Sequence, residues 1–250
     1  MRIERDGELA LVRMEAGKAN SMNREMLAKL LELFRELEDS DARGVVITGD
    51  GRSFCAGLAL TTLIDLDRGS MRGFIDAFSE TMTRLFRLGL PVVAAIDGHA
   101  IAGGCVLAAQ CDVRIAAEGA ARIGINEVQL GIGVPSVVLE PMRLLLPPAS
   151  FVPVALEGKL FTPSEAKQVG LVDEVVAPTQ LLPRAIERAR ELAAVPGEAF
   201  AQVKLGWRRG ALDAIARDND DVRERWLDTW FSADAQQRLR AVVERLRAKS

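Results

Sequence analysis

Two short turns rich in small residues constrain this chain most, because each follows a predicted buried strand. The first turn is SFCAGL at 53–58, shortly after the β-branched strand 45–48. The second is GHAIAGGCV at 98–106, directly after the apolar strand 91–96. Small side chains leave backbone N–H groups accessible, and two such groups directed at one point form an oxyanion hole. The pattern predicts a backbone site that can stabilise a negatively charged oxygen.

A single glutamate follows the two turns. Glu127 lies in the segment INEV at 125–128, among apolar residues. A lone glutamate in a loop is usually solvated, whereas an apolar pocket would raise its pKa toward neutrality and suit it to proton transfer. Together the turns and Glu127 predict an enzyme that stabilises an enolate and moves a proton with one carboxylate.

The spacing of apolar residues predicts strands that alternate with helices, which is typical of an α/β core with a mainly parallel sheet. The expected elements are a hairpin within 3–14, a helix capped by Ser21, a helix over 71–88, a helix that begins at Gly103 and a strand over 112–116.

The second half is predicted to be mostly helical. The segment TPSE at 162–165 has the pattern of a capping box with proline at the first helical position. A break at Pro196-Gly197 divides a predicted core, 1–195, from a C-terminal helical region, 196–250. That region carries an apolar stripe made of Leu239, Val242, Val243 and Leu246. The stripe has to pack on its own domain or on a neighbouring subunit.

Composition and charge exclude several classes of protein. The 250 residues are 49% hydrophobic, enough for a sizeable core, and the net charge of −3 gives no electrostatic footprint for nucleic acid. Three cysteines, an odd number, favour free thiols in a reducing compartment. A charged N-terminus and the lack of an apolar run of roughly 18 residues argue against a signal peptide and a membrane span. We therefore expect a soluble, cytoplasmic protein.

Other candidate sites are weaker. The only histidine, His99, has nothing in the sequence to orient it, and we expect a structural loop residue. One histidine and scattered cysteines do not match a zinc-ligand pattern, so no metal is expected. Cys55 and Cys105 flank the glycines and are predicted to be small buried thiols.

Several segments, in their order and spacing, resemble the crotonase (enoyl-CoA hydratase/isomerase) superfamily over nearly the whole length. They are FCAG at 54–57, DGHAIAGGC at 97–105, CDVRIA at 111–116, NEVQLG at 126–131 and EAKQVGLVD at 165–173. The resemblance implies an α/β spiral of β-β-α units with a C-terminal helical trimerisation region. It also implies an acyl-CoA thioester as substrate, with CoA as part of the substrate and no separate cofactor, and a homotrimer or dimer of trimers.

The resemblance assigns roles to individual residues. The oxyanion donors would be the N–H groups of Leu58 and Gly103, and the second would gain from a helix dipole. Hydratases of the family use two glutamates, whose positions here hold Val106 and Glu127. Valine cannot handle a proton, which favours an isomerase, in which one base moves a proton from C2 to C4, over a hydratase. The segments 124–132 and 156–162 are most similar to the short-chain Δ3,Δ2-enoyl-CoA isomerase branch.

Substrate-binding residues follow from the resemblance alone. Lys18 would lie near the nucleotide, and the loop with Ala56, Ala59 and Leu60 would follow the pantetheine. Ala59 departs from the aspartate that is frequent there, so the hydrogen bonds of an aspartate are not expected in this loop.

The predicted substrate-binding set also includes Gly104 and Val106. Lys204 or Arg208 are candidates to meet the CoA phosphates, with a solvated surface charge as the alternative. The stretch 61–72 would roof the acyl pocket.

Three functions remain open at this stage. The first is an enoyl-CoA isomerase. The second is another acyl-CoA lyase, hydratase or thioester hydrolase on the same scaffold. The third is a non-catalytic acyl-CoA binder or assembly subunit.

Overall fold

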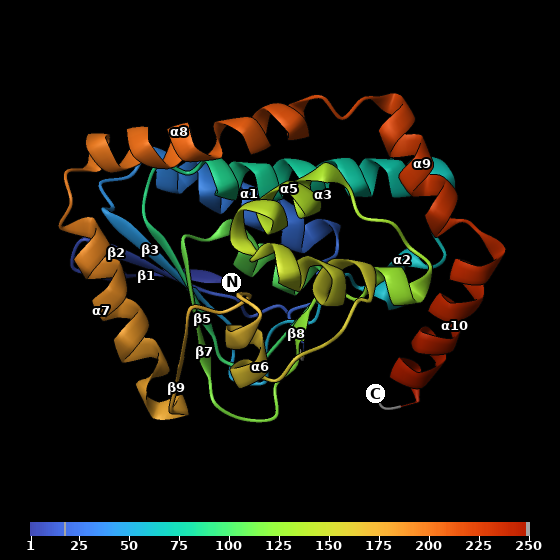
Figure 1. Cartoon of the computed structure of the whole chain (residues 1–250), viewed down its shortest axis with the longest axis horizontal. Coiled ribbons are helices and arrows are strands. Elements are labelled where there is room, and N and C mark those ends of the chain that lie inside the picture. The colour runs from blue at the N-terminus through green and yellow to red at the C-terminus, as the bar shows by residue number, and fades with distance from the viewer. Residues whose placement is uncertain (18, 249–250) are drawn as a thin grey trace.

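The computed structural model describes residues 1–17 and 19–248. Its main layer is a six-stranded sheet in the order β1-β2-β3-β5-β7-β9 (Figure 1). The strands are β1 (Arg2–Asp6), β2 (Leu9–Arg13), β3 (Gly44–Thr48), β5 (Val92–Ile96), β7 (Val113–Ala117) and β9 (Glu174–Val176). Among the strand pairs of this sheet, β1–β2 is the antiparallel one, and its hairpin turns at Gly7, whose φ is +61°. The predicted α/β core with a mainly parallel sheet is confirmed.

A second, smaller sheet lies beside the first. It is parallel, in the order β4-β6-β8, with strands β4 (Ser53–Cys55), β6 (His99–Ile101) and β8 (Ile123–Gly124). The chain visits the large sheet, then the small sheet, then a helix, and repeats this path from β3, from β5 and from β7. This is the predicted spiral of β-β-α units.

Helices cover both faces of the large sheet because its strands are apolar on both sides. Alternate residues such as Val46 and Val93 pack against α7 (Leu181–Ala193), and their neighbours Val45 and Ile47 join the main core. The helices of that core include α1 (Arg24–Glu38), α3 (Arg68–Arg87), α4 (Gly103–Gln110), α5 (Ser136–Leu145) and α6 (Pro163–Gln168).

The N-terminus of α1 differs from the prediction. Its cap is Asn23, whose side chain accepts a hydrogen bond from the N–H of Met26 (2.8 Å), and Ser21 lies outside the helix. The reason is that Met22 forms a parallel bridge with Leu58, so the helix begins only after that pairing. The predicted capping box of Thr162 and Glu165 on α6 is confirmed.

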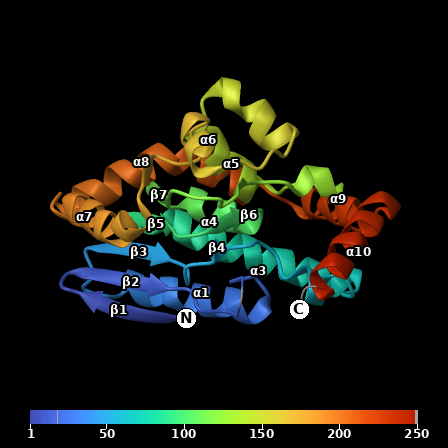
Figure 2. The ribbon, with the colours of Figure 1, turned by 90° about the horizontal axis from the view of Figure 1, so that it is seen from below.

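The C-terminal region consists of α8 (Gly197–Ala216), α9 (Asp220–Trp230) and α10 (Ala233–Arg247). Figures 1 and 2 both place α10 at the end of the molecule opposite α7. Trp226 and Trp230 stack with ring centroids 5.7 Å apart, and both belong to the main core together with Leu239 and Val243. Leu239 and Val243 of the predicted apolar stripe therefore pack on their own chain, whereas Val242 is partly exposed and Leu246 is 45% exposed. A division at 195/196 remains a prediction.

Within residues 1–17 and 19–248, no helix is long and apolar enough to cross a membrane.

Candidate active site

The three predicted catalytic positions follow the carboxyl ends of the three strands of the small sheet. β4 ends at Cys55, just before Leu58, and β6 ends at Ile101, just before Gly103. β8 ends at Gly124, just before Glu127. Since parallel neighbours end at one edge of a sheet, the topology places all three segments at the same edge, where ligands of open parallel sheets usually bind.

The two turns approach each other closely at Gly57. A Cβ on this residue would lie 2.9 Å from the Cβ of Ala102 and 3.3 Å from the nitrogen of Gly103. The φ of Gly57 is +86°, a conformation that favours glycine. Glycine at this position therefore lets the turn that carries Leu58 approach the beginning of α4.

The backbone around Leu58 leaves its N–H group without an internal partner. Met22 donates to the carbonyl of Gly57 (2.8 Å) and accepts from the N–H of Ala59 (2.9 Å), so it pairs with the residues on either side of Leu58. In this parallel bridge pattern the N–H of Leu58 points away from Met22. Within the described part of the chain it donates to no other group.

Gly103 begins α4, and its N–H belongs to the first turn, where a helix has no internal acceptors. The helix dipole adds partial positive charge there. Ala102, immediately before it, has φ +51° and ψ −123°, which is a strained conformation for alanine. The strain fixes the backbone at the point where the chain turns from β6 into α4.

Glu127 opens a 3₁₀ turn, η1 (Glu127–Leu130). Burial raises the pKa of its carboxyl group to about 7, against the lowering effect of the backbone N–H groups of Glu127 and Asn126. Its Oε2 is buried and has no hydrogen-bond partner within residues 1–17 and 19–248. Although the residue as a whole is partly exposed, this oxygen is shielded from bulk water. Glu127 thus combines an unpaired oxygen with a pKa near neutrality, as a proton-transfer group requires.

Cys105, in the first turn of α4, interacts electrostatically with Glu127. Burial, with a smaller contribution from the negative charge of Glu127, raises the pKa of the Cys105 thiol to about 12. The carboxylate is therefore within electrostatic reach of the first turn of α4, which contains Gly103.

The remaining predicted substrate residues fall into three groups. Ala56, Ala59 and Leu60 are partly exposed, and Ala59 caps the short helix α2 (Leu60–Leu63) without a side-chain hydrogen bond. Gly104 and Val106 are buried in α4, where Val106 is 1% exposed. Lys18 lies outside the described residues.

Both alternatives predicted for the basic residues of α8, contact with the CoA phosphates and a solvated surface charge, are wrong. Lys204 and Arg208 are buried and bind the carboxylate of Asp112 at 2.6 Å and 2.8 Å, so they do not meet CoA phosphates. Arg114, close to Asp112 in the sequence, binds Asp173 (2.7 Å). The reason is that α8 packs beside the beginning of β5, next to Asp112, and supplies both cations.

Asn20 is a site-supporting residue that the sequence reasoning did not single out. It is fully buried with φ +47°, accepts from the N–H of Ala16 (2.7 Å) and donates to the carbonyl of Ser53 (3.0 Å). Its neighbour Ala19 accepts from the N–H of Ala56 (3.0 Å). Asn20 therefore joins the loop before α1 to the turn that presents Leu58. The sequence offers one signal for this role of Asn20, because asparagine adopts a positive φ more readily than most other residues.

His99 and the cysteines have structural environments. Nδ1 of His99 accepts from the N–H of Arg122 (3.0 Å), which ties β6 to the segment before β8. Cys55, Cys105 and Cys111 are free and buried, and burial raises the pKa of each thiol to about 12. These thiols are in their protonated, poorly nucleophilic form at neutral pH.

Comparison with known proteins gives the family. A family model described as enoyl-CoA hydratase/isomerase matches residues 4–249. The human mitochondrial enoyl-CoA delta isomerase 1 is 31% identical over 242 residues, which are 96% of this chain and 80% of that protein. A short-chain-enoyl-CoA hydratase from Clostridium acetobutylicum is also 31% identical, over 211 residues that make up 83% of this chain and 80% of the relative.

The fold agrees with a solved structure of the same family. The crystal structure of human mitochondrial Δ3-Δ2-enoyl-CoA isomerase superimposes with a TM-score of 0.94 at 31% identity, covering 100% of this chain and 98% of the other. Because an isomerase and a hydratase are equally similar in sequence, identity alone does not select between the two reactions. The chain belongs to the crotonase, or enoyl-CoA hydratase/isomerase, family.

Proposed function

We propose that this protein is an enoyl-CoA isomerase that converts a 3-enoyl-CoA into the conjugated 2-trans-enoyl-CoA. The observation that carries the proposal is that position 127 holds a buried carboxyl group, whereas position 106 holds a valine. Glu127 has a buried, unpaired oxygen and a pKa of about 7. Val106, at the position where hydratases of the family have their other glutamate, is 1% exposed and apolar.

The reaction requires only one base. The thioester oxygen accepts hydrogen bonds from the N–H groups of Leu58 and Gly103. Glu127 removes a proton from C2, the charge moves onto that oxygen as an enolate, and the same carboxyl group returns the proton at C4. Loss of one donor of such a pair typically slows catalysis about 100- to 1000-fold.

Hydration is the second candidate, favoured by the hydratase relative of equal identity. Addition of water needs a group that positions the water and a group that handles the α-proton. Val106 can do neither, so hydration would require a water held by another residue.

Product mass separates the alternatives. The purified protein is incubated with a 3-enoyl-CoA, and separately with a 2-enoyl-CoA, and the products are separated from the substrate by chromatography and identified by mass spectrometry. An isomer of unchanged mass supports the proposal, whereas a product heavier by one water indicates a hydratase and free CoA indicates a hydrolase. Tight binding of the thioester without any product would indicate a non-catalytic acyl-CoA binder.

We also propose a homotrimer or a dimer of trimers. Support comes from Val203 and Trp207, one turn apart on α8, which are 66% and 60% exposed and offer an apolar surface. Sedimentation velocity at micromolar concentration tests this, and a monomer peak would contradict it.

A further inference from the structure

The C-terminal helices contact both sides of the candidate active site. On one side, the indole N–H of Trp226 donates to the carbonyl of Gly133 (2.9 Å), and the N–H of Gly133 donates to Oγ1 of Thr229 (3.0 Å). Gly133 follows shortly after Glu127 and η1. On the other side, α9 packs on α3, which follows the turn that carries Leu58. The helix α9 thus links Gly133, which follows the Glu127 turn, to α3, which follows the turn of the first oxyanion donor.

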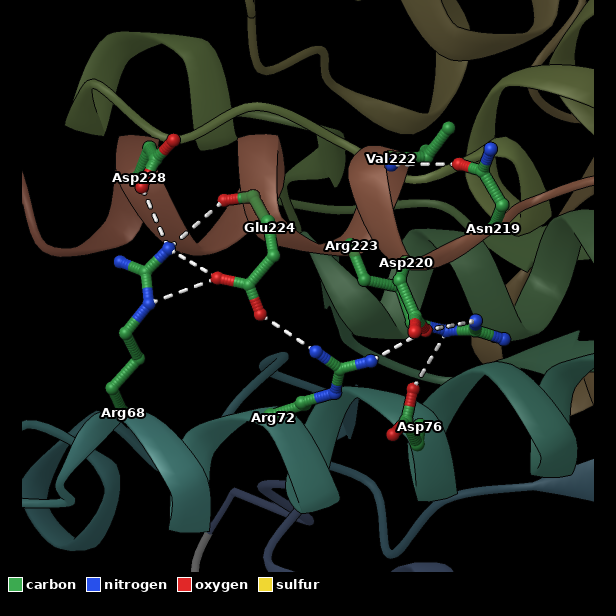
Figure 3. Close-up of polar contacts among 9 residues, drawn as sticks. All are labelled: Arg68, Arg72, Asp76, Asn219, Asp220, Val222, Arg223, Glu224 and Asp228. Atoms are coloured by element: carbon green, nitrogen blue, oxygen red, sulfur yellow. Dashed lines mark hydrogen bonds and ion pairs between the residues drawn. The ribbon is translucent and has the colours of Figure 1, made fainter.

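A ladder of ion pairs joins α9 to α3 (Figure 3). Arg68 binds the carboxylates of Glu224 and Asp228, each at 2.6 Å. Arg72 binds Asp220 and Glu224, also at 2.6 Å each. The acidic residues are spaced four apart on one face of α9, and the two arginines are spaced four apart on α3. Like charges at this spacing repel within a helix, and Arg68 and Arg72 of α3 offset this repulsion among the acidic residues of α9. Within α9 itself, Arg223 adds a longer contact to Asp220 (3.5 Å).

The last rung of the ladder has the opposite polarity. Here α3 supplies the acid, Asp76, and α9 supplies the base, Arg223, with 3.0 Å between them. A slip of one helical turn in one direction would bring Asp76 beside Asp220 and Glu224, which are like charges. A slip in the other direction would leave Asp228 unpaired. The charge pattern therefore specifies one register, as polar positions do in paired helices.

We propose that Arg68 and Arg72 are positioning residues for the reaction. By fixing the register of α9 on α3, they hold the Glu127 turn at its working position relative to the N–H groups of Leu58 and Gly103. The inference rests on the proposed function for its kinetic readout. The apolar contacts of Trp226 and Trp230 keep α9 docked without the ladder, so losing the arginines changes alignment more than stability.

The test compares the double variant Arg68→Gln/Arg72→Gln with a matched control, Arg84→Gln. Arg84 lies on the same helix and binds Glu38 of α1 at 2.6 Å, away from α9. The double variant is expected to lose roughly tenfold in kcat with KM for 3-enoyl-CoA within about twofold, since misplacement of the base affects the chemical step. Arg84→Gln is expected to keep the wild-type kcat. The variant Arg68→Lys/Arg72→Lys, which retains the charges, should recover most of the loss.

A second readout does not depend on turnover. Hydrogen exchange of the segment 125–133 is expected to rise at least about threefold in the double variant and to stay unchanged in Arg84→Gln. Unchanged exchange overturns the proposal whichever reaction the protein catalyses. If the wild type does not isomerise the substrate but the difference in hydrogen exchange is present, the proposed function is refuted. The proposal that the ladder aligns α9 would then still hold. Equal loss of kcat in Arg84→Gln and the double variant would also overturn the proposal.

Discussion

Gly104 packs so closely on Cys55 that a Cβ at Gly104 would lie 1.9 Å from the carbonyl oxygen of Cys55. This contact joins α4 to β4 and thereby sets the distance between the two turns. The adjacent glycines have different tasks: Gly103 presents its N–H, and Gly104 allows the close approach that brings Gly103 beside the turn of Leu58.

Replacing Gly104 by alanine is expected to destabilise the protein by at least about 3 kcal/mol, because the new methyl group would overlap a backbone carbonyl that cannot move aside. Gly210→Ala is the matched control, since Gly210 sits within α8 and a methyl group there would meet nothing within 4 Å. It should gain about 0.5–1 kcal/mol through helix propensity. Urea unfolding measures both, and equal stabilities for the two variants would contradict the packing argument.

Glu127 is expected to lower stability at neutral and alkaline pH. Its pKa is raised from 4.5 to about 7 in the folded state, so the folded protein binds this proton more tightly than the unfolded chain does. The stability that this bound proton adds to the folded state is fully present below pH 4.5 and is lost as the pH rises through about 7. Glu127→Gln, which cannot ionise, should therefore be more stable than the wild type by about 3 kcal/mol at pH 8 and nearly equal at pH 4.

Unfolding in urea at the two pH values measures this difference. Glu25→Gln is the control, because the hydrogen bond from Lys29 lowers the pKa of Glu25 and the expected shift has the opposite sign. A Glu127→Gln variant that is less stable than the wild type at pH 8 would show that the carboxylate is not desolvated.

The rate of the wild type should follow the ionisation of Glu127. A base must be deprotonated in the free enzyme, so kcat/KM is expected to rise about tenfold per pH unit below pH 7 and to level off above it. Repeating the profile with a pantetheine thioester removes the titration of the CoA phosphates. A flat profile between pH 5 and 8 would count against Glu127 as the base.

Asp112 is expected to be essential for stability rather than for catalysis. It is the carboxylate that compensates the buried cations Lys204 and Arg208. Burial lowers the pKa of Lys204 to about 8, despite the attraction of Asp112. Asp112→Asn should cost about 3–5 kcal/mol, because it leaves both cations without a counter-charge.

The matched control for this prediction is Asp41→Asn. Asp41 binds Arg5 at 2.8 Å, but its side chain is 91% exposed. Such a pair is worth at most about 1 kcal/mol. If Asp112→Asn were as mild as Asp41→Asn in thermal unfolding, the buried cluster would not hold α8 on the core.

The sequence was sufficient where local chemistry decides the structure. The small residues of the two turns, the apolar neighbours of Glu127 and the capping box at Thr162 all act within a few positions, and the fold places them as predicted. The partners of Lys204 and Asn20 could not be predicted, because Asp112 and Ser53 are distant in sequence and meet these residues only through tertiary packing. A lysine on an amphipathic helix is usually solvated, so only the folded chain shows that Lys204 is buried.

The most direct measurement of the central claim follows the ultraviolet absorbance of the conjugated 2-enoyl thioester after a 3-enoyl-CoA is mixed with wild type or Glu127→Gln. Circular dichroism and thioester binding confirm that the variant is folded and binds substrate. The account predicts growth of the band with the wild type and a rate at least about 100-fold lower with Glu127→Gln. Equal rates for the two proteins, or no band with either while the thioester binds, would contradict it.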